Sequence, residues 1–215
     1  MPLPALIFDF GNVIAFFDYM LTFDRLGKRI GTSGQELRAR LDAAGFWDLA
    51  HRFESGLIEP EDFARQTMTL AGVSMTHDEF VADWEDIFTL NEPVGKLIPE
   101  LKAQGYPLLL GSNTNILHAR HYRQKFREVL DRFDHFILSY EVRVMKPERG
   151  FFDACVAAAG VPADSCLFID DAEPNVAGAR RAGLQALVYR DHSELLAELA
   201  RHGVKLPPSL QSGSS

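Results

Sequence analysis

The residues of this sequence that could perform chemistry lie in four short clusters beside apolar runs. The run from Ala5 to Phe8 leads into Asp9, and a Gly-Asn pair then breaks it, which is typical of a buried strand that stops in a loop. Because parallel sheets bind ligands at the carboxyl ends of their strands, we expect polar residues that follow such strands to meet at one edge. The other clusters are Ser112-Asn113, Lys146 with Pro147, and Asp170-Asp171.

Carboxylates and a lysine at one sheet edge would suit phosphoryl chemistry. Asp9, Asp170 and Asp171 would repel one another, and Mg²⁺ would relieve that repulsion because it prefers oxygen ligands. With Lys146 added, such a site carries no net charge and can accept a phosphate dianion. Asp9 can then serve as the nucleophile, since aspartates form acyl-phosphate intermediates.

The rest of the chain divides into two parts that would position these clusters. From about residue 20 to 90 the spacing is helical, without convincing strands, and Thr76 is expected to begin a helix that reaches Phe88. From Pro93 onward short apolar runs alternate with helical segments, which predicts an α/β fold with a doubly wound parallel sheet. We expect a core formed by residues 1–14 and 91–205, an inserted all-helical cap at 15–90, and a flexible tail at 206–215.

Composition and charge exclude several classes of protein. The chain has 215 residues, 47% of them hydrophobic and 24% charged, as is ordinary for a globular protein. Its net charge of −8 disfavours nucleic acid and membranes as partners, so an anionic ligand needs locally placed positive charge. Cys155 and Cys166 make no disulfide framework, and no signal peptide or run of about 20 apolar residues is visible. We therefore expect a cytoplasmic protein with reduced thiols.

Four motifs, in order along the chain, resemble those of the haloacid dehalogenase superfamily. They are Phe8-Asp9-Phe10-Gly11-Asn12-Val13, Gly111-Ser112-Asn113-Thr114-Asn115, Lys146-Pro147-Glu148 and Ile169-Asp170-Asp171-Ala172-Glu173-Pro174-Asn175. The helical insert lies in the gap that a cap occupies in such proteins, and the turn from Glu54 to Ile58 is similar to one common in such caps. The resemblance implies a Rossmann-like core and a small phosphorylated substrate.

The resemblance also implies a role for each site residue. Mg²⁺ would be held by oxygen ligands from two strand ends, namely Asp9, the backbone carbonyl of Gly11, Asp171 and, directly or as a support, Asp170. The phosphate would be bound by Ser112, Asn113 and Lys146, and the lysine would also neutralise charge beside the nucleophile. For Asn175 we favour a structural role in its loop.

One position departs from the family pattern. Most phosphatases of the superfamily carry a second aspartate where this chain has Gly11, and general acid–base catalysis by such a group is typically worth about 10²–10⁴-fold. A substrate with a good leaving group, such as an anomeric sugar oxygen, would need the acid less. The sequence is also similar to bacterial α-D-glucose-1-phosphate phosphatases, which have Gly here. Asp18 is a candidate substitute acid, although capping of the next helix is the stronger expectation.

We therefore favour a Mg²⁺-dependent phosphatase that acts on a small phosphomonoester, preferably an aldose 1-phosphate, through an aspartyl-phosphate on Asp9. Other activities stay open. A binding module could retain the phosphate site without turnover. A 2-haloacid dehalogenase would use the same nucleophile without Mg²⁺, and a phosphotransferase would use the same intermediate.

Overall fold

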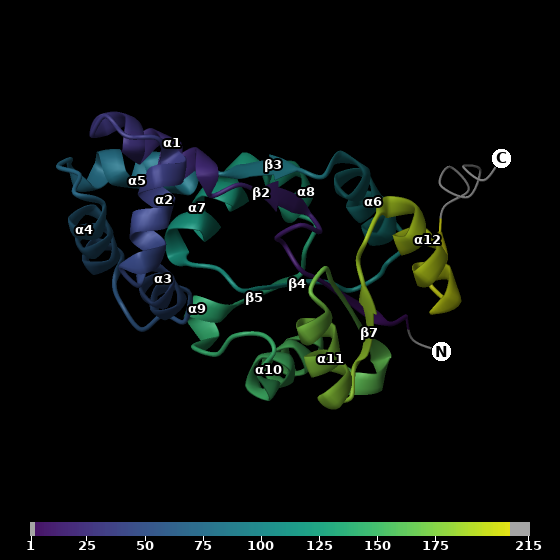
Figure 1. Ribbon diagram of the computed structural model, residues 1–215. Coiled ribbons are helices and arrows are strands. Elements are labelled where there is room, and N and C mark those ends of the chain that lie inside the picture. Colours follow the sequence, from purple (N-terminus) through teal and green to yellow (C-terminus); the bar gives the residue numbers. More distant parts are fainter. Residues whose placement is uncertain (1–2, 207–215) are drawn as a thin grey trace.

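A five-stranded parallel sheet in the order β5-β4-β1-β6-β7 forms the centre of the computed structural model, which describes residues 3–206 (Figure 1). Its strands are β1 (Ala5–Phe8), β4 (Leu108–Ser112), β5 (His135–Leu138), β6 (Cys166–Asp170) and β7 (Gln185–Val188). The predicted α/β fold with a Rossmann-like parallel sheet is confirmed. The tail expected at 206–215 lies, apart from Leu206, outside the described residues.

Both faces of the sheet are covered, which is why its central strand is apolar on both sides. Leu6 and Phe8 of β1 pack with the helices of one face, and Ala5 and Ile7 pack with those of the other. On the first face lie α6 (Glu92–Ala103), α7 (Ile116–Lys125), α8 (Arg127–Leu130) and α12 (His192–Arg201). The second face carries α10 (Arg149–Ala159) and α11 (Glu173–Arg181), and α9 (Ser139–Val142) and η1 (Ala163–Ser165) are short connections. No helix within residues 3–206 combines the length and apolar character that crossing a membrane requires.

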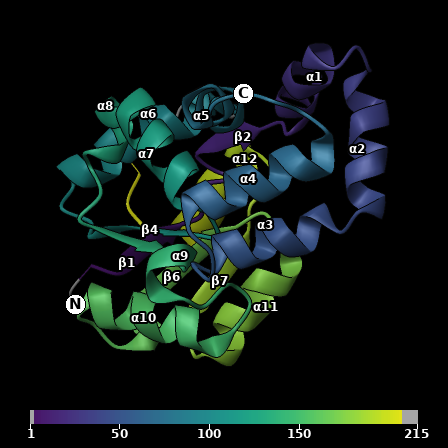
Figure 2. The same cartoon turned by 90° about the vertical axis from the view of Figure 1, so that its left-hand side faces the viewer.

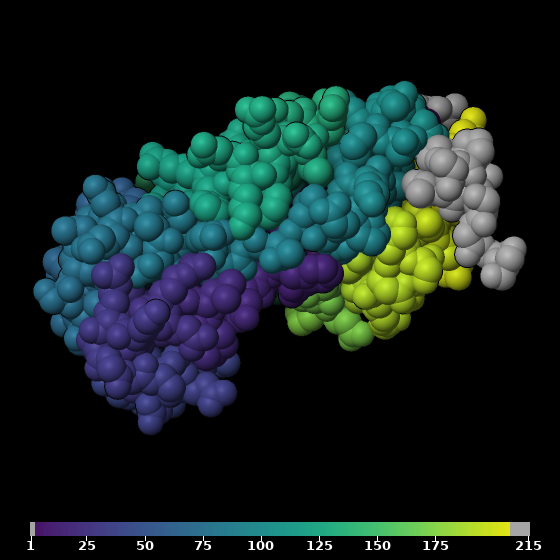
Figure 3. Space-filling view, turned by 90° about the horizontal axis from the view of Figure 1, so that it is seen from above, coloured from purple at the N-terminus to yellow at the C-terminus, as the bar shows by residue number. Residues whose placement is uncertain are grey.

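Five further helices pack together at one end of the molecule (Figures 1 and 3). They are α1 (Met20–Arg29), α2 (Gly34–Ala43), α3 (Phe46–Glu54), α4 (Pro60–Ala71) and α5 (His77–Glu85). Capping boxes begin two of them, at Ser33 for α2 and at Thr76 for α5. The group has its own apolar core, in which the Phe53 and Phe63 rings stack with centroids 4.3 Å apart. We refer to residues 15–90 as the cap. Figure 2 views the molecule from this side and shows α3 beside α9 of the core.

A two-stranded ribbon joins the cap to the sheet. It consists of β2 (Ala15–Phe17) and β3 (Phe88–Leu90), which pair in antiparallel register. The prediction of a strand-free segment up to residue 90, with a helix that reaches Phe88, was therefore wrong: α5 ends at Glu85, and Phe88 pairs with Phe17. Apolar spacing shows that Phe88 is buried, but the partner strand lies far away in the sequence, and local periodicity cannot show it.

Candidate active site

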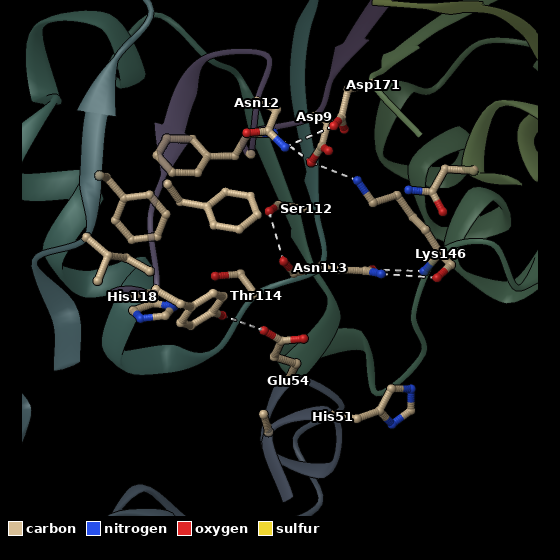
Figure 4. Close-up of a pocket in the computed structure, with 18 of the residues that line it drawn as sticks. Asp9, Asn12, His51, Glu54, Ser112, Asn113, Thr114, His118, Lys146 and Asp171 are labelled. Atoms are coloured by element: carbon tan, nitrogen blue, oxygen red, sulfur yellow. Dashed lines mark hydrogen bonds and ion pairs between the residues drawn. The ribbon is translucent and has the colours of Figure 1, made fainter. Parts of the chain in front are cut away.

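The carboxyl ends of three neighbouring strands bring the predicted site residues together (Figure 4). Asp9 follows β1, Ser112 ends β4, and Asp170 ends β6. β1 lies between β4 and β6. The strands β4 and β5 are added on one side of β1, and the strands β6 and β7, which come later in the chain, are added on the other side. Open parallel sheets bind ligands at such a switch point.

Three carboxylates form a possible metal site among residues 3–206. Oxygen atoms of Asp9, Asp170 and Asp171 lie within 4.8 Å of one another. Oxygens on opposite sides of Mg²⁺ lie about 4.2 Å apart, so small adjustments would bring these atoms to bonding distance. Asn12 Nδ2 donates to Asp171 Oδ2 at 3.0 Å and so orients that carboxylate. Gly11, the predicted carbonyl ligand, lines the same cleft. An all-oxygen donor set of this kind fits Mg²⁺.

Lys146 links two of these carboxylates. Its Nζ lies 2.7 Å from Asp9 Oδ1 and 2.7 Å from Asp170 Oδ2, and it donates to Gly111 O at 3.0 Å. Asp170 also accepts from the Ala172 amide at 2.9 Å and from Asn175 Nδ2 at 3.0 Å. A carboxylate has about four lone-pair sites, so these donors leave Asp170 little capacity for a metal. Its contacts make it a support for Lys146, and Asn175 has the structural role expected of it.

Burial and charge set the protonation of this cluster. Burial raises the pKa of the Asp9 carboxyl to about 8, against the lowering effect of Lys146, and the Asp170 charge adds to the rise. Burial alone would lower the pKa of Lys146, but the carboxylates of Asp9 and Asp170 outweigh it and raise that pKa. Three carboxylates and one ammonium leave an excess of negative charge, so a bound dication would favour the ionised form of Asp9.

Asn113 holds the backbone of Lys146. Its Nδ2 donates to Lys146 O at 3.0 Å, and its Oδ1 accepts from Lys146 N at 2.9 Å. The side chain predicted to bind phosphate is thus engaged with the lysine. Ser112 is buried and lines the cleft, with a long hydrogen bond of 3.4 Å from its Oγ to Asn113 O. It does not cap α7, because Asn115 is the N-cap and accepts the His118 amide.

A cleft of about 440 Å³ lies between this edge and the cap. Residues that the sequence did not identify as site residues line it, namely Asn12, Phe17, Tyr19, Trp47, His51, Glu54, Thr114 and His118. Most come from the cap or from elements packed against it, and a single sequence does not reveal which side chains of the cap face the core. The clearest available signal was the polar turn that begins at Glu54.

Two carboxylates at the entrance to the cap, those of Asp18 and Glu54, differ in their contacts and in whether they line the cleft. Asp18 Oδ1 accepts from the Met20 amide at 2.8 Å at the start of α1, and Asp18 does not line the cleft. Glu54 lines the cleft and accepts from the Tyr19 hydroxyl at 3.3 Å. Burial raises the pKa of the Glu54 carboxyl to about 7, although the Tyr19 hydrogen bond opposes the rise. Asp18 therefore has the capping role, and Glu54 is an ionisable group of the cap whose pKa lies near neutrality.

Comparisons with known proteins agree with the motifs. A family model described as a haloacid dehalogenase-like hydrolase matches residues 3–183. Phosphatase MT3486 of Mycobacterium tuberculosis is 25% identical over 191 residues, which cover 86% of this chain and 87% of that protein. D-ribitol-5-phosphate phosphatase of Bacteroides thetaiotaomicron is 24% identical over 204 residues, which cover 90% and 95%. These names do not confirm the finer resemblance to α-D-glucose-1-phosphate phosphatases.

A solved structure shows the same fold with ligands. It is a HAD family enzyme of Bacteroides thetaiotaomicron in complex with magnesium and inorganic phosphate, and its TM-score with this chain is 0.74. The two chains are 27% identical, and the match covers 90% of this chain and 99% of the other. The likeness therefore extends over the sheet and the cap together.

Proposed function

This chain belongs to the haloacid dehalogenase-like hydrolases, and from this premise we propose that it hydrolyses small phosphomonoesters in a Mg²⁺-dependent reaction through an aspartyl-phosphate on Asp9. The observation that carries the proposal is the position of Asp9 in the cleft. Its carboxylate lies beside both the Lys146 ammonium and the Asp170-Asp171 pair. Such a site combines a nucleophile with the positive charge that a phosphate dianion needs.

Each side chain then has a defined part. Asp9, Asp171 and the carbonyl of Gly11 would hold Mg²⁺, which when bound supplies charge stabilisation for the phosphoryl oxygens. The free oxygen of Asp9 attacks phosphorus. Lys146 would offset negative charge between phosphate and nucleophile, and Ser112, which lines the cleft, would donate to a phosphate oxygen.

The cleft and the relatives support a proposal for the substrate class. Its volume of about 440 Å³ suits a small molecule, and exposed parts of Tyr19 and Trp47 offer aromatic faces on which a sugar or polyol chain can pack. A relative is named for D-ribitol 5-phosphate. We propose a sugar or polyol phosphate. An aldose 1-phosphate is favoured if no acid protonates the leaving oxygen, and a primary alkyl phosphate becomes suitable if one does.

The decisive experiment measures phosphate release from glucose 1-phosphate, ribitol 5-phosphate and p-nitrophenyl phosphate, with Mg²⁺ and with EDTA. We expect turnover with Mg²⁺, loss with EDTA, and a fall of more than about 10³-fold in Asp9→Asn, because the nucleophile is gone. Asp18→Asn is the matched control and keeps its activity, since that carboxylate lies outside the cleft.

Other outcomes would identify the alternatives. Phosphate binding without release of product by the wild-type protein would indicate a binding module. Chloride release from 2-chloropropionate in EDTA would indicate a dehalogenase. Near-normal turnover by Asp9→Asn would remove Asp9 as the nucleophile.

A further inference from the structure

Gly11 stands where most phosphatases of the superfamily carry an acid, and a glycine has no proton to give to the leaving oxygen. A Cβ atom at Gly11 would lie 3.0 Å from Cε1 of Phe17, so the ring of Phe17 fills the space beside the glycine. A primary alkoxide is a poor leaving group without a proton. If the proposed function holds, on which this inference rests, an acid for such substrates has to come from another part of the cleft.

We propose that Glu54, carried by the cap, is the general acid for the leaving oxygen and then the base that activates water. It is the last residue of α3, is half-buried, and lines the same cleft as Asp9 and Lys146. Figure 4 shows its carboxylate directed into the cleft from the cap side, with Ser112 and Asn113 between it and Asp9. Glu54 thus faces the nucleophile across the phosphate-binding loop.

This placement suits an in-line displacement. The attacking and leaving oxygens lie on opposite sides of phosphorus in the transition state. If phosphate binds between Asp9 and Ser112, the oxygen opposite Asp9 would point away from the sheet and toward the cap, because Figure 4 shows Ser112 between Asp9 and Glu54. Glu54 is the carboxylate on that side, whereas Asp170 and Asp171 lie on the side of the nucleophile.

Hydrogen bonds between the cap and the core fix the backbone of Glu54 relative to Thr114, which lies in the loop after Ser112. The hydroxyl of Ser139 donates to Glu54 O at 2.6 Å and accepts from the Thr114 amide at 2.9 Å, so one core side chain connects the two segments. The next residue, Ser55, lies with its Oγ 3.0 Å from the Met145 sulfur. The carboxylate is oriented separately, by the hydroxyl of Tyr19 at 3.3 Å.

The surroundings of Glu54 support both protonation states near neutral pH. Burial raises its pKa to about 7, and the Tyr19 hydrogen bond opposes the rise. Other titratable groups lie nearby. His51 lies one turn earlier on α3 and is exposed. Burial lowers the pKa of His118 on α7 to about 3, so that ring is neutral. On α9 the hydroxyl of Tyr140 donates to Glu141 rather than to Glu54. An acid and base poised near the working pH is the efficient arrangement.

The proton balance closes over the two steps. In the first, an Asp9 oxygen bonds to phosphorus, the bond from phosphorus to the leaving oxygen breaks, and the Glu54 proton moves to that oxygen. In the second, the Glu54 carboxylate takes a proton from water while the water oxygen attacks phosphorus and the bond to Asp9 breaks. The alcohol and phosphate leave, and Glu54 ends protonated, as it began.

The test compares Glu54→Gln on an alkyl ester, ribitol 5-phosphate or glycerol 3-phosphate, and on an aryl ester, p-nitrophenyl phosphate. Nitrophenolate leaves without a proton, so kcat/KM should fall by about 10²-fold or more for the alkyl ester and by less than about 10-fold for the aryl ester. For the aryl ester kcat should fall as well, with the phosphorylated Asp9 peptide accumulating after acid quench, because water is no longer activated. Glu61→Gln, an exposed glutamate of the cap, is the matched control, and thermal melting checks that both variants are folded.

The pH profile gives a second readout. With the alkyl ester, kcat/KM of the wild type should fall on the alkaline side as Glu54 loses its proton. Tyr19→Phe should move that limb to higher pH, because the lost hydrogen bond stabilised the ionised form. The assignment of Glu54 would be overturned if Glu54→Gln lowered kcat/KM equally for both esters. It would also be overturned if only His51→Asn lowered kcat/KM selectively for the alkyl ester. Either result would leave the proposed phosphatase activity intact. Absence of wild-type turnover on every ester would overturn the proposed function with it.

Discussion

Lys146 is the residue on which the charge balance of the site depends. Its side chain is buried between Asp9 and Asp170, which are buried too. Removal of one partner from a buried ion pair leaves an uncompensated charge, and such a change typically destabilises a protein by about 3–5 kcal/mol. Loss of this lysine is therefore expected to affect folding as well as the proposed chemistry.

We expect Lys146→Met to lower the free energy of unfolding by about 3–5 kcal/mol at alkaline pH and by less at acidic pH. The sign follows from Asp9: its pKa in the folded protein, already raised to about 8, rises further without the lysine, whereas the unfolded value stays near 3.8. Folding then takes up a proton, which favours the folded state at low pH and disfavours it as pH rises. Urea unfolding in EDTA at about pH 5.5 and about pH 8.5 measures this difference.

The matched control is Lys102→Met, which removes an exposed lysine paired with Asp134. Exposed pairs contribute about 0–1 kcal/mol, so this variant should change little at either pH. A loss for Lys146→Met that is equally small, or that does not depend on pH, would show that the cluster is not charged as described.

Site residues at strand ends could be predicted from the sequence, whereas those positioned by tertiary contacts could not. Asp9, Ser112 and Asp170 directly follow or end apolar runs, so their meeting at one sheet edge was predictable. The engagement of the Asn113 side chain by Lys146 was not, because it depends on how two loops meet. Glu54 was recognised only as part of a turn, since the direction of its side chain depends on how the cap packs on the core.

At the scale of elements, the contact between α3 and α9 fixes the cap on the core. Gly56, just after α3, has φ +66°, and a Cβ atom there would lie 2.2 Å from Tyr140 O. No side chain fits without separating the two elements. This glycine therefore permits the close approach that brings Glu54 to the cleft.

We predict that Gly56→Ala lowers both stability and activity. The left-handed backbone alone costs about 1 kcal/mol with a side chain, and the clash with Tyr140 O adds to it and displaces the cap. Gly72→Ala is a close control: it has φ +68° and nothing within 4 Å of the added Cβ. Comparing the melting temperatures and the kcat/KM values of the two variants separates the effect of the clash with Tyr140 O from that of the left-handed backbone. Equal losses in both variants would mean that the contact between Gly56 and Tyr140 does not position the cap.

Elements that follow local rules were easier to predict than those set by tertiary contacts. The helix start expected at Thr76 is confirmed, because a capping box begins α5 there. The segment from Ile116 to Leu130 has helical spacing throughout, but it is broken at Phe126 into α7 and α8. Phe126 is buried beside Phe10, so packing against β1 and its loop, which local spacing does not report, accompanies the break.

At the scale of the whole molecule, separate apolar cores lie in the cap and on the sheet. We propose that the cap at 15–90 and the core at 1–14 and 91–205 open as separate units. Phe63→Ala should cost about 3–5 kcal/mol, because Phe63 is fully buried in the cap and stacks on Phe53.

Hydrogen exchange should locate the effect of that variant. Amides of α1–α5 are expected to exchange faster, while those of β1, β4 and β6 keep their protection. Phe152→Ala, equally buried beside Phe168 on the sheet, should give the reverse pattern. Faster exchange throughout the molecule in both variants would show a single cooperative unit.

The β2–β3 ribbon has a consequence for how the cap of such a protein can evolve. Ala15 and Leu90 are partners across the ribbon, so the insertion departs and returns at neighbouring points. A stretch with its two ends together can be shortened, lengthened or exchanged at small entropic cost to the remainder. An exchanged cap could thus bring a different substrate preference, and an acid to replace the one missing at Gly11, without any change in the strand ends of the core.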